Sequence, residues 1–112
     1  DILDHLRSAQ HNEYQEWDHD YAGFSRTAQE EGFQEIAHIF SMIAGIEKTH
    51  GDRFGKFAEL LEQDKLFVSD VQVKWMCLNC GQIIDATMAP AVCPVCKHPQ
   101  GYFIRWEMAP FE

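Results

Sequence analysis

Four cysteines toward the C-terminal end constrain the fold of this chain more than any other feature of its sequence. They form two CxxC pairs, Cys77–Cys80 and Cys93–Cys96, separated by twelve residues. Each CxxC is a tight turn that directs two thiolates toward one point, so two facing turns predict a closed tetrahedral site with four sulfur ligands. Gly81 follows the first pair and allows backbone N–H groups to turn toward sulfur. Disulfides are disfavoured because the spacing is regular and nothing points to secretion.

The spacing alone leaves the metal open between zinc and iron, because both accept four thiolates in a tetrahedron. Zinc ribbons are the more numerous family, which favours zinc slightly. Aromatic residues supply a core around so small a site, and this resembles rubredoxin, a one-iron electron carrier; they are Trp75, Tyr102, Phe103 and Trp106. Four sulfurs complete the coordination, so His98 is expected at the surface or beside a ligand.

The composition changes abruptly along the chain. No Pro and no Cys occur up to about Leu61, whereas all four of each follow Lys65. We therefore expect a helical module at residues 1–64, a linker at 65–72 with strand character beginning near Val71, and a small β module at 73–112. A chain of 112 residues has room for one or two such units.

In the first module, apolar residues recur at helical spacing in two segments. The first segment contains Leu6, Trp17, Tyr21, Phe24 and Ala28, and the second contains Ile36, Phe40, Ile43, Phe54, Phe57 and Leu61. Gly32 fits the junction, since glycine readily adopts the left-handed conformation that closes a helix. The pattern predicts an antiparallel helical hairpin. Two long amphipathic helices cannot bury their apolar faces against each other alone, so we expect half of a four-helix bundle.

A carboxylate and an imidazole interrupt the apolar face of the second segment. Its inward positions step through 36, 40, 43, 47, 50, 54, 57 and 61, so Glu47 and His50 are expected on the core side. An unpaired carboxylate there would cost several kcal/mol. Counted from the turn at Gly32, Glu16 lies at nearly the height of Glu47, and Glu13 at nearly the height of His50. All four side chains are therefore expected in one layer.

Glu-x-x-His on one helix, opposed by a Glu on its neighbour, is half of the ligand set of carboxylate di-iron bundles. Carboxylate oxygens with one imidazole suit iron or manganese better than zinc or copper. The alternative is that Glu47 pairs with Lys48 or Arg53, and that Glu13 and Glu16 belong to a solvated acidic face. The matched heights favour the metal site.

Charge and hydropathy exclude several classes of partner. The net charge of −9 and the absence of a basic run argue against nucleic acids and anionic membranes. The apolar stretches fall short of the roughly 20 residues that span a bilayer, and no signal-peptide pattern is visible.

Together these motifs resemble the second half of rubrerythrin, over almost the whole chain. The stretches that carry the resemblance are Glu13-Tyr14-Gln15-Glu16-Trp17, Glu30-Glu31-Gly32-Phe33, Glu35-Ile36-Ala37, Glu47-Lys48-Thr49-His50 and the two CxxC pairs. The resemblance implies a mainly α fold, with half of a ferritin-like bundle followed by a rubredoxin-like FeS4 domain. It implies that Glu13 and Glu47 are iron ligands, terminal and bridging, and that His50 is a terminal nitrogen ligand. Glu16 would be the mobile carboxylate, with Tyr21 near it.

The implied activity is that of a peroxidase of the NADH peroxidase type, which reduces hydrogen peroxide to water at a di-iron centre. Electrons would arrive through the iron held by Cys77, Cys80, Cys93 and Cys96, from a reductase, in a cytoplasmic homo-oligomer. The other half of the di-iron ligands is expected from an N-terminal helix pair, because the chain opens within a helix at Asp1, or from a second copy of the hairpin. The alternatives are ferritin-like iron oxidation and storage, or a zinc-ribbon binding module.

Overall fold

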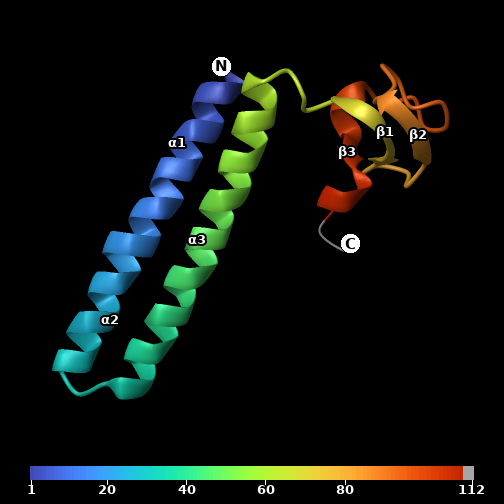
Figure 1. Ribbon diagram of the computed structural model, residues 1–112. Helices are drawn as coiled ribbons and strands as arrows, with labels where there is room; N and C mark the ends of the chain where they lie inside the picture. Colours follow the sequence, from blue (N-terminus) through green and yellow to red (C-terminus); the bar gives the residue numbers. More distant parts are fainter. Residues whose placement is uncertain (110–112) are drawn as a thin grey trace. The chain divides into compact units, whose positions relative to one another are not determined.

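The computed structural model describes residues 1–109, and the chain divides into two units, Asp1–Glu62 and Gln63–Glu112 (Figure 1). Residues 110–112, the end of the expected β module, lie outside the described residues. No helix among residues 1–109 is long and apolar enough to cross a membrane. Each unit is described by itself below.

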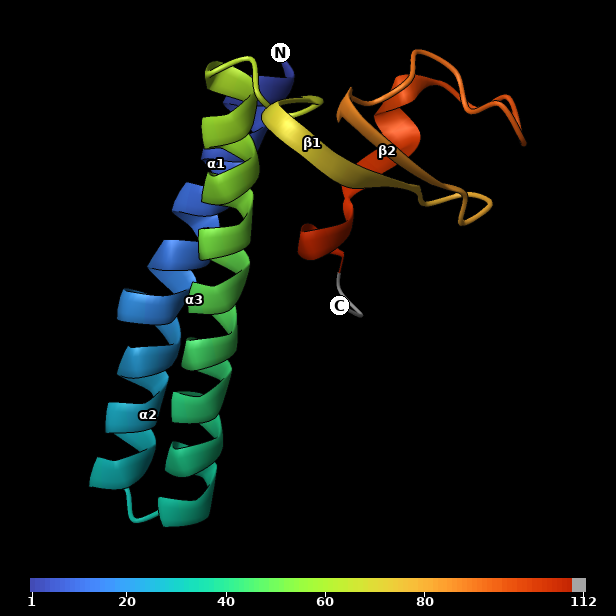
Figure 2. The same cartoon turned by 45° about the vertical axis from the view of Figure 1, so that its right-hand side comes forward.

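The first unit is an antiparallel helical hairpin, which confirms the predicted fold. Helix α1 (Ile2–Gln15) continues through a π-helical segment, Glu16–Asp20, into α2 (Tyr21–Glu30), and α3 (Gln34–Glu62) returns beside them. The helices lie side by side in both views (Figures 1 and 2). Gly32 makes the turn with φ of +88°, and the Phe33 N–H donates to the Ala28 carbonyl at 2.8 Å. A residue with a Cβ would be strained at this φ, so glycine is required here.

The π-helical segment was not expected from the sequence. Its wider turn is marked by the Tyr21 N–H, which donates to the Glu16 carbonyl five residues earlier. One extra residue in a turn changes the direction of every side chain that follows, relative to a regular α-helix. Such segments occur frequently at functional sites, and this one begins at one of the expected ligands.

Small residues, and not the large apolar ones, form most of the buried surface of α3. The buried positions of this helix are Ala37, Ala44, Gly51, Gly55, Ala58 and Leu60. Positions 36, 40, 43, 47, 50, 54, 57 and 61, which were expected to face the interior of a four-helix bundle, are all at least partly exposed in the hairpin alone, and their place in a complete bundle stays a prediction. Small side chains allow two helices to approach closely, whereas the large ones are displaced to the flank of the contact.

Apolar side chains remain exposed along the hairpin. Phe24 is 52% exposed, and on α3 the exposed fractions of Ile36, Met42 and Ile46 are 47%, 51% and 51%. The rings of Tyr21, Phe24 and Phe40 lie within 6.1 Å of one another. An apolar surface of this kind is what a helix pair presents when it forms one half of a larger bundle.

The second unit is built on a small antiparallel sheet with the strand order β2–β1–β3. Strand β1 (Val68–Cys77) is central, β2 (Ile83–Met88) pairs Trp75 with Ile84, and β3 (Phe103–Arg105) pairs Cys77 with Phe103. The strand begins at Val68, inside the stretch expected as a linker, because Val68 pairs with Met88 ahead of an irregular step before Val73. Strand pairing thus shortens the connection.

The core of this unit contains two of the four aromatic residues expected there. Trp75 and Phe103 are buried with Cys77, Cys93 and Ala89, and the Trp75 indole N–H donates to the Ala86 carbonyl at 2.9 Å. Tyr102 and Trp106 were expected in the same core, but Tyr102 is 41% exposed and Trp106 is partly exposed. Phe67, which was not expected there, packs against this core instead.

Candidate metal centres

The two CxxC turns bring all four sulfurs together. The Sγ atoms of Cys77 and Cys96 are 3.6 Å apart, as are those of Cys80 and Cys93, and all four lie within 4.8 Å of one another. A tetrahedron with metal–sulfur bonds of about 2.3 Å has sulfurs about 3.8 Å apart. The four cysteines therefore fit a single tetrahedral zinc or iron ion.

The two turns are built alike, and only one of them has a glycine. Gly81 follows the first pair with φ of +88°, and its N–H donates to the Cys77 carbonyl at 2.8 Å. Lys97 occupies the same place after the second pair, with φ of +69° and an N–H bond of 3.0 Å to the Cys93 carbonyl. Left-handed backbone is uncommon for a lysine, so the cysteine cluster imposes this conformation. The sequence contained one sign of this similarity between the turns, since Gly81 and Lys97 each come directly after the second cysteine of a pair.

The pKa values of three of the thiols are shifted, two downward and one upward. The backbone N–H of His98 lowers the pKa of Cys96 to about 5, with further help from the Asn79 and His98 side chains and against the effect of desolvation. The backbone N–H of Cys96 lowers the pKa of Cys93. The Gln82 N–H acts in the same direction on Cys80, but desolvation and the three other sulfurs raise that pKa to about 11. A bound cation, which favours thiolates, would reverse the last effect.

Two polar side chains beside the cluster are directed at Cys96. Asn79 lies within the first turn, and His98 follows the second; both side chains lower the pKa of Cys96, while His98 Nδ1 is buried without a hydrogen-bond partner. The His98 ring also packs against Tyr102, with centroids 4.5 Å apart. His98 therefore lies beside a ligand. The effect of Asn79 on the pKa of Cys96 could not be predicted from the sequence, apart from the position of Asn79 inside a CxxC turn.

The hairpin gathers a second set of ligand atoms from α1 and α3. His50 Nδ1 lies 3.6 Å from Glu13 Oε2 and 3.8 Å from Glu47 Oε2. One oxygen or nitrogen from each of the three residues falls within 4.8 Å of the others. The Glu13 and Glu47 side chains are only 21% and 15% exposed, whereas His50 is 41% exposed. Two carboxylates and an imidazole thus meet on the flank of the hairpin.

Glu13 has an unusual oxygen. Its Oε2 atom is buried and has no hydrogen-bond donor, although it faces the His50 ring. A buried carboxylate oxygen without a partner is destabilising, and a cation bound between Glu13, Glu47 and His50 would supply the missing partner. Hard carboxylate oxygens with one imidazole suit iron or manganese. The residues therefore fit a metal of this class.

Glu16 lies next to this set, at the start of the π-helical segment. Its pKa is raised, first by a hydrogen bond shared with Glu47, then by desolvation and by the charges of Glu47 and Asp20. Two carboxylates that share a proton repel each other once both are ionised. Glu16 therefore holds a proton more readily than an isolated glutamate.

Tyr21, the other residue expected near the site, is tied to it through the backbone. Its N–H makes the π-helical bond to Glu16, and its ring contacts Phe24 and Phe40 with centroids 5.7 Å and 6.1 Å away. An open hollow beside the carboxylates is lined by Glu13, His50, Arg53 and Phe54. A role for Tyr21 in catalysis stays a prediction.

Comparison with known proteins assigns both regions to one family. A family model described as rubrerythrin matches residues 3–75, and one described as the rubredoxin-like domain of rubrerythrin matches residues 75–104. Rubrerythrin-1 of Clostridium acetobutylicum is 40% identical over 103 residues, which cover 92% of this chain and 53% of that protein. Rubrerythrin of Clostridium perfringens is 45% identical with the same coverage of each chain, 92% and 53%.

Among solved structures, nigerythrin in a mixed-valence state has 27% sequence identity to the chain and a TM-score of 0.49, and the match covers 90% of this chain and 48% of that one. The chain spans about half the length of the curated relatives it matches. The region shared with them includes both candidate metal centres described above.

Proposed function

The chain belongs to the rubrerythrin family. From that premise we propose that it functions as a non-haem di-iron peroxidase, which reduces hydrogen peroxide to water. The observation that carries the proposal is the Glu13 carboxylate. Its buried oxygen has no donor and faces Glu47 and His50, as a metal ligand would. The rubrerythrin family carries a di-iron centre and a rubredoxin-like FeS4 site, and the four clustered cysteines fit the second of these.

Bound iron would supply two electrons, which together with two protons convert one hydrogen peroxide molecule into two waters. The residues of this chain hold the charge and the protons around that reaction. Glu13 and Glu47 supply anionic oxygens, and His50 supplies a neutral nitrogen. Glu16, which holds a proton more readily than an isolated glutamate, is the carboxylate to which we assign the exchange between metal-bound and free positions. We propose that Tyr21 acts beside Glu16 in catalysis.

The cysteine site is assigned to electron supply. A mononuclear FeS4 centre changes by one electron at a time, so peroxide reduction would require two transfers. We propose that these electrons come from NADH through a reductase, and that the cysteine site of one chain serves a neighbouring chain in a homo-oligomer. A cytoplasmic location agrees with the unpaired cysteines.

The second half of the di-iron ligands must come from outside the hairpin. Glu13, Glu47 and His50 supply half of the set used by carboxylate di-iron bundles, and the exposed apolar flank of α3 offers the surface on which further helices pack. We assign the other half to an additional helix pair, with a second copy of the hairpin as the alternative.

The test is peroxide consumption by the iron-loaded protein with a chemical reductant, together with metal analysis and a visible spectrum. We expect turnover that ends when either the carboxylate cluster or the cysteine cluster is removed. Iron mineral formation without peroxide turnover would indicate an iron-storage protein. Colourless protein that contains only zinc would indicate a zinc-ribbon binding module, and it would contradict the proposal.

A further inference from the structure

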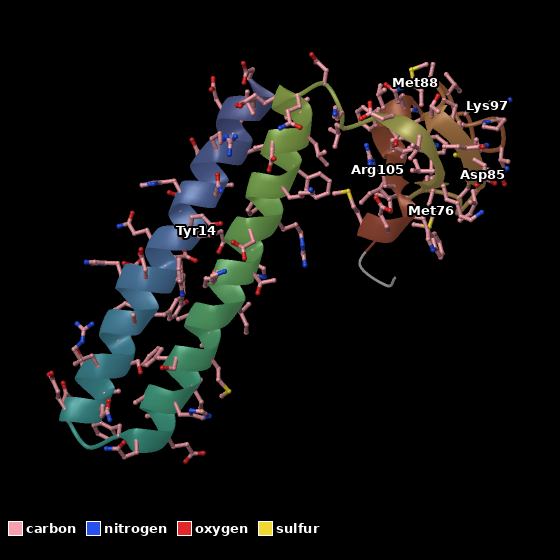
Figure 3. All side chains as sticks on the ribbon, in the orientation of Figure 1. Tyr14, Met76, Asp85, Met88, Lys97 and Arg105 are labelled. Atoms are coloured by element: carbon pink, nitrogen blue, oxygen red, sulfur yellow. The ribbon has the colours of Figure 1, made fainter. Side chains whose placement is uncertain are left out.

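A group of side chains across the contact between the two arms of the hairpin lies at the height of the carboxylates without taking part in their cluster; Tyr14, labelled in Figure 3, is its centre. It consists of Tyr14, Trp17, Lys48, Gly51 and Asp52, which we call the Tyr14 cluster. Tyr14 Oη donates to Asp52 Oδ1 at 2.6 Å, and Lys48 Nζ donates to Asp52 Oδ2 at 3.0 Å. Lys48 also lies over the Trp17 ring, 5.4 Å from its centroid. The cluster therefore joins α1 to α3.

Gly51 is one of two points of close approach between α1 and α3; the other is Gly55, which lies against the Gln10 side chain outside this cluster. A Cβ at this position would lie 2.5 Å from two carbons of the Tyr14 ring, a separation that no pair of carbons adopts without displacement. The ring cannot rotate away freely, because its hydroxyl is bonded to Asp52 and its edge meets Trp17 at a centroid distance of 5.8 Å. Glycine is otherwise unfavourable inside a helix, so the close contact accounts for its presence.

Four of the five members of the cluster each directly follow an expected ligand in the sequence. Tyr14 follows Glu13, Trp17 follows Glu16, Lys48 follows Glu47, and Gly51 follows His50. Successive residues of a helix are turned by about 100° around its axis. The ligands therefore point to one flank of the contact between the helices, while the residues after them point into or across it. Any change in the spacing at Gly51 moves Glu13 relative to His50.

We infer that the Tyr14 cluster sets the separation of α1 and α3 in the ligand layer, and that Tyr14 and Gly51 are positioning residues for the metal held by Glu13, Glu47 and His50. This inference rests on the proposed function, since it assigns the residues a role toward that metal. Side chains that orient metal ligands typically affect metal affinity by about 10- to 100-fold. A contact that merely stabilised the fold would change the melting temperature but not the coordination of the metal.

The test uses cobalt(II) as the probe, added to the whole chain after the cysteine site has been filled with zinc. Gly51→Ala is the main variant, and Gly45→Ala on the same helix is its matched control, because a Cβ at Gly45 meets nothing within 4 Å. We expect Gly51→Ala to weaken cobalt binding at least about tenfold and to change the visible d–d spectrum of the bound ion. Gly45→Ala should bind cobalt as the wild type does. Tyr14→Phe, which keeps the ring but removes the hydroxyl, should give a smaller weakening.

Crystal structures of the same variants give a reading that does not depend on metal. The distance from Glu13 Oε2 to His50 Nδ1 is 3.6 Å in the wild type. It should increase in Gly51→Ala and stay the same in Gly45→Ala. Unchanged cobalt affinity, spectrum and separation in Gly51→Ala would overturn the inference. Should Gly51→Ala fail to fold, an unaltered affinity and spectrum in Tyr14→Phe would overturn it.

The two proposals fail in different ways. When the wild-type chain takes up no cobalt, the crystal structures alone decide whether the Tyr14 cluster sets the spacing, and peroxide turnover decides the proposed function. A hairpin that binds cobalt with the expected differences, in a protein without peroxide turnover, leaves the inference standing and removes the proposed function.

Discussion

The cysteine cluster has four ligands on two tight turns of one small unit, whereas the carboxylate cluster has three on two long helices that meet only along one side. The first has a complete tetrahedral set of ligands and is therefore closed, with Cys77 and Cys93 buried, Cys96 half-buried and Cys80 exposed. The second is open, with His50 41% exposed. A turn gathers its own ligands through local backbone geometry, so a few residues suffice. Ligands on helices are brought together only by helix packing, and their geometry depends on contacts elsewhere along the interface.

The largest expected effect removes one ligand of the closed site. Cys93→Ser should lower the affinity of the cysteine site for metal by several orders of magnitude, since three thiolates no longer complete the tetrahedron. We expect the second unit to lose stability with the metal, while the helical circular dichroism of the hairpin is retained. Leu78→Ala, an exposed residue (53%) in the same site, is the control. Loss of the helical signal together with the metal would contradict the independence of the two units.

Removal of one ligand from the open site should strongly weaken metal binding by the hairpin and leave the cysteine site unchanged. Glu47→Ala should reduce iron or cobalt binding by the hairpin at least about 100-fold, and leave the colour of the FeS4 site intact. Metal content and the visible spectrum report both sites in one sample. Glu35→Ala, in the first turn of α3 and exposed, should bind metal as the wild type does. A loss of both metals would refute the assignment of two separate sites.

A smaller effect is expected where the closed site is altered without removal of a ligand. His98→Phe and Asn79→Ala each remove a side chain that lowers the pKa of Cys96, and groups that favour the thiolate also favour the more negative, reduced state of the iron. The reduction potential should therefore fall in both variants, by at most about 59 mV, which is tenfold in the one-electron equilibrium. Val95→Ala, which alters an exposed side chain (61%), should leave the potential unchanged. An equal or higher potential in both variants would show that these side chains do not act on the iron.

The smallest effect concerns the metal-free open site. Glu47 raises the pKa of Glu16 above its ordinary value of 4.5, so the folded hairpin binds this proton more tightly than the unfolded chain. The stability that it contributes is complete below pH 4.5 and is lost as the pH rises through the raised pKa. Glu16→Gln should remove that loss and raise the melting temperature of the metal-free protein at pH 7 by a few degrees at most. A melting temperature that falls at pH 7 would contradict repulsion between the carboxylates.

The sequence was most informative where geometry is local. Cys77, Cys80, Cys93 and Cys96 were identified from spacing, because a CxxC turn has few possible shapes. Gly32 was identified as the turn for the same reason, since only a residue without a Cβ readily takes its φ of +88°. The family, the hairpin and the small β unit followed from these patterns, and all three are confirmed.

Predictions failed where the answer depended on packing. Tyr102 has a large aromatic side chain of the kind that usually fills a core, but it lies at the surface, where its ring packs against His98. The large apolar residues of α3 have the spacing of a helix interface, yet Ala37, Ala44 and Ala58 occupy the buried side. Hydrophobic periodicity identifies an apolar face, but it does not say which part of that face meets the partner helix and which part awaits another one.

The ligand types and their order along the chain could be predicted, because both are properties of residue identity and spacing. The way in which the open site is held depends on how the helices pack. The π-helical turn at Glu16–Asp20 and the contact of Tyr14 with Gly51 appear in no residue pattern. The reason is physical: helix spacing is set by the fit of side chains across an interface, and that fit exists only after two distant segments have packed together.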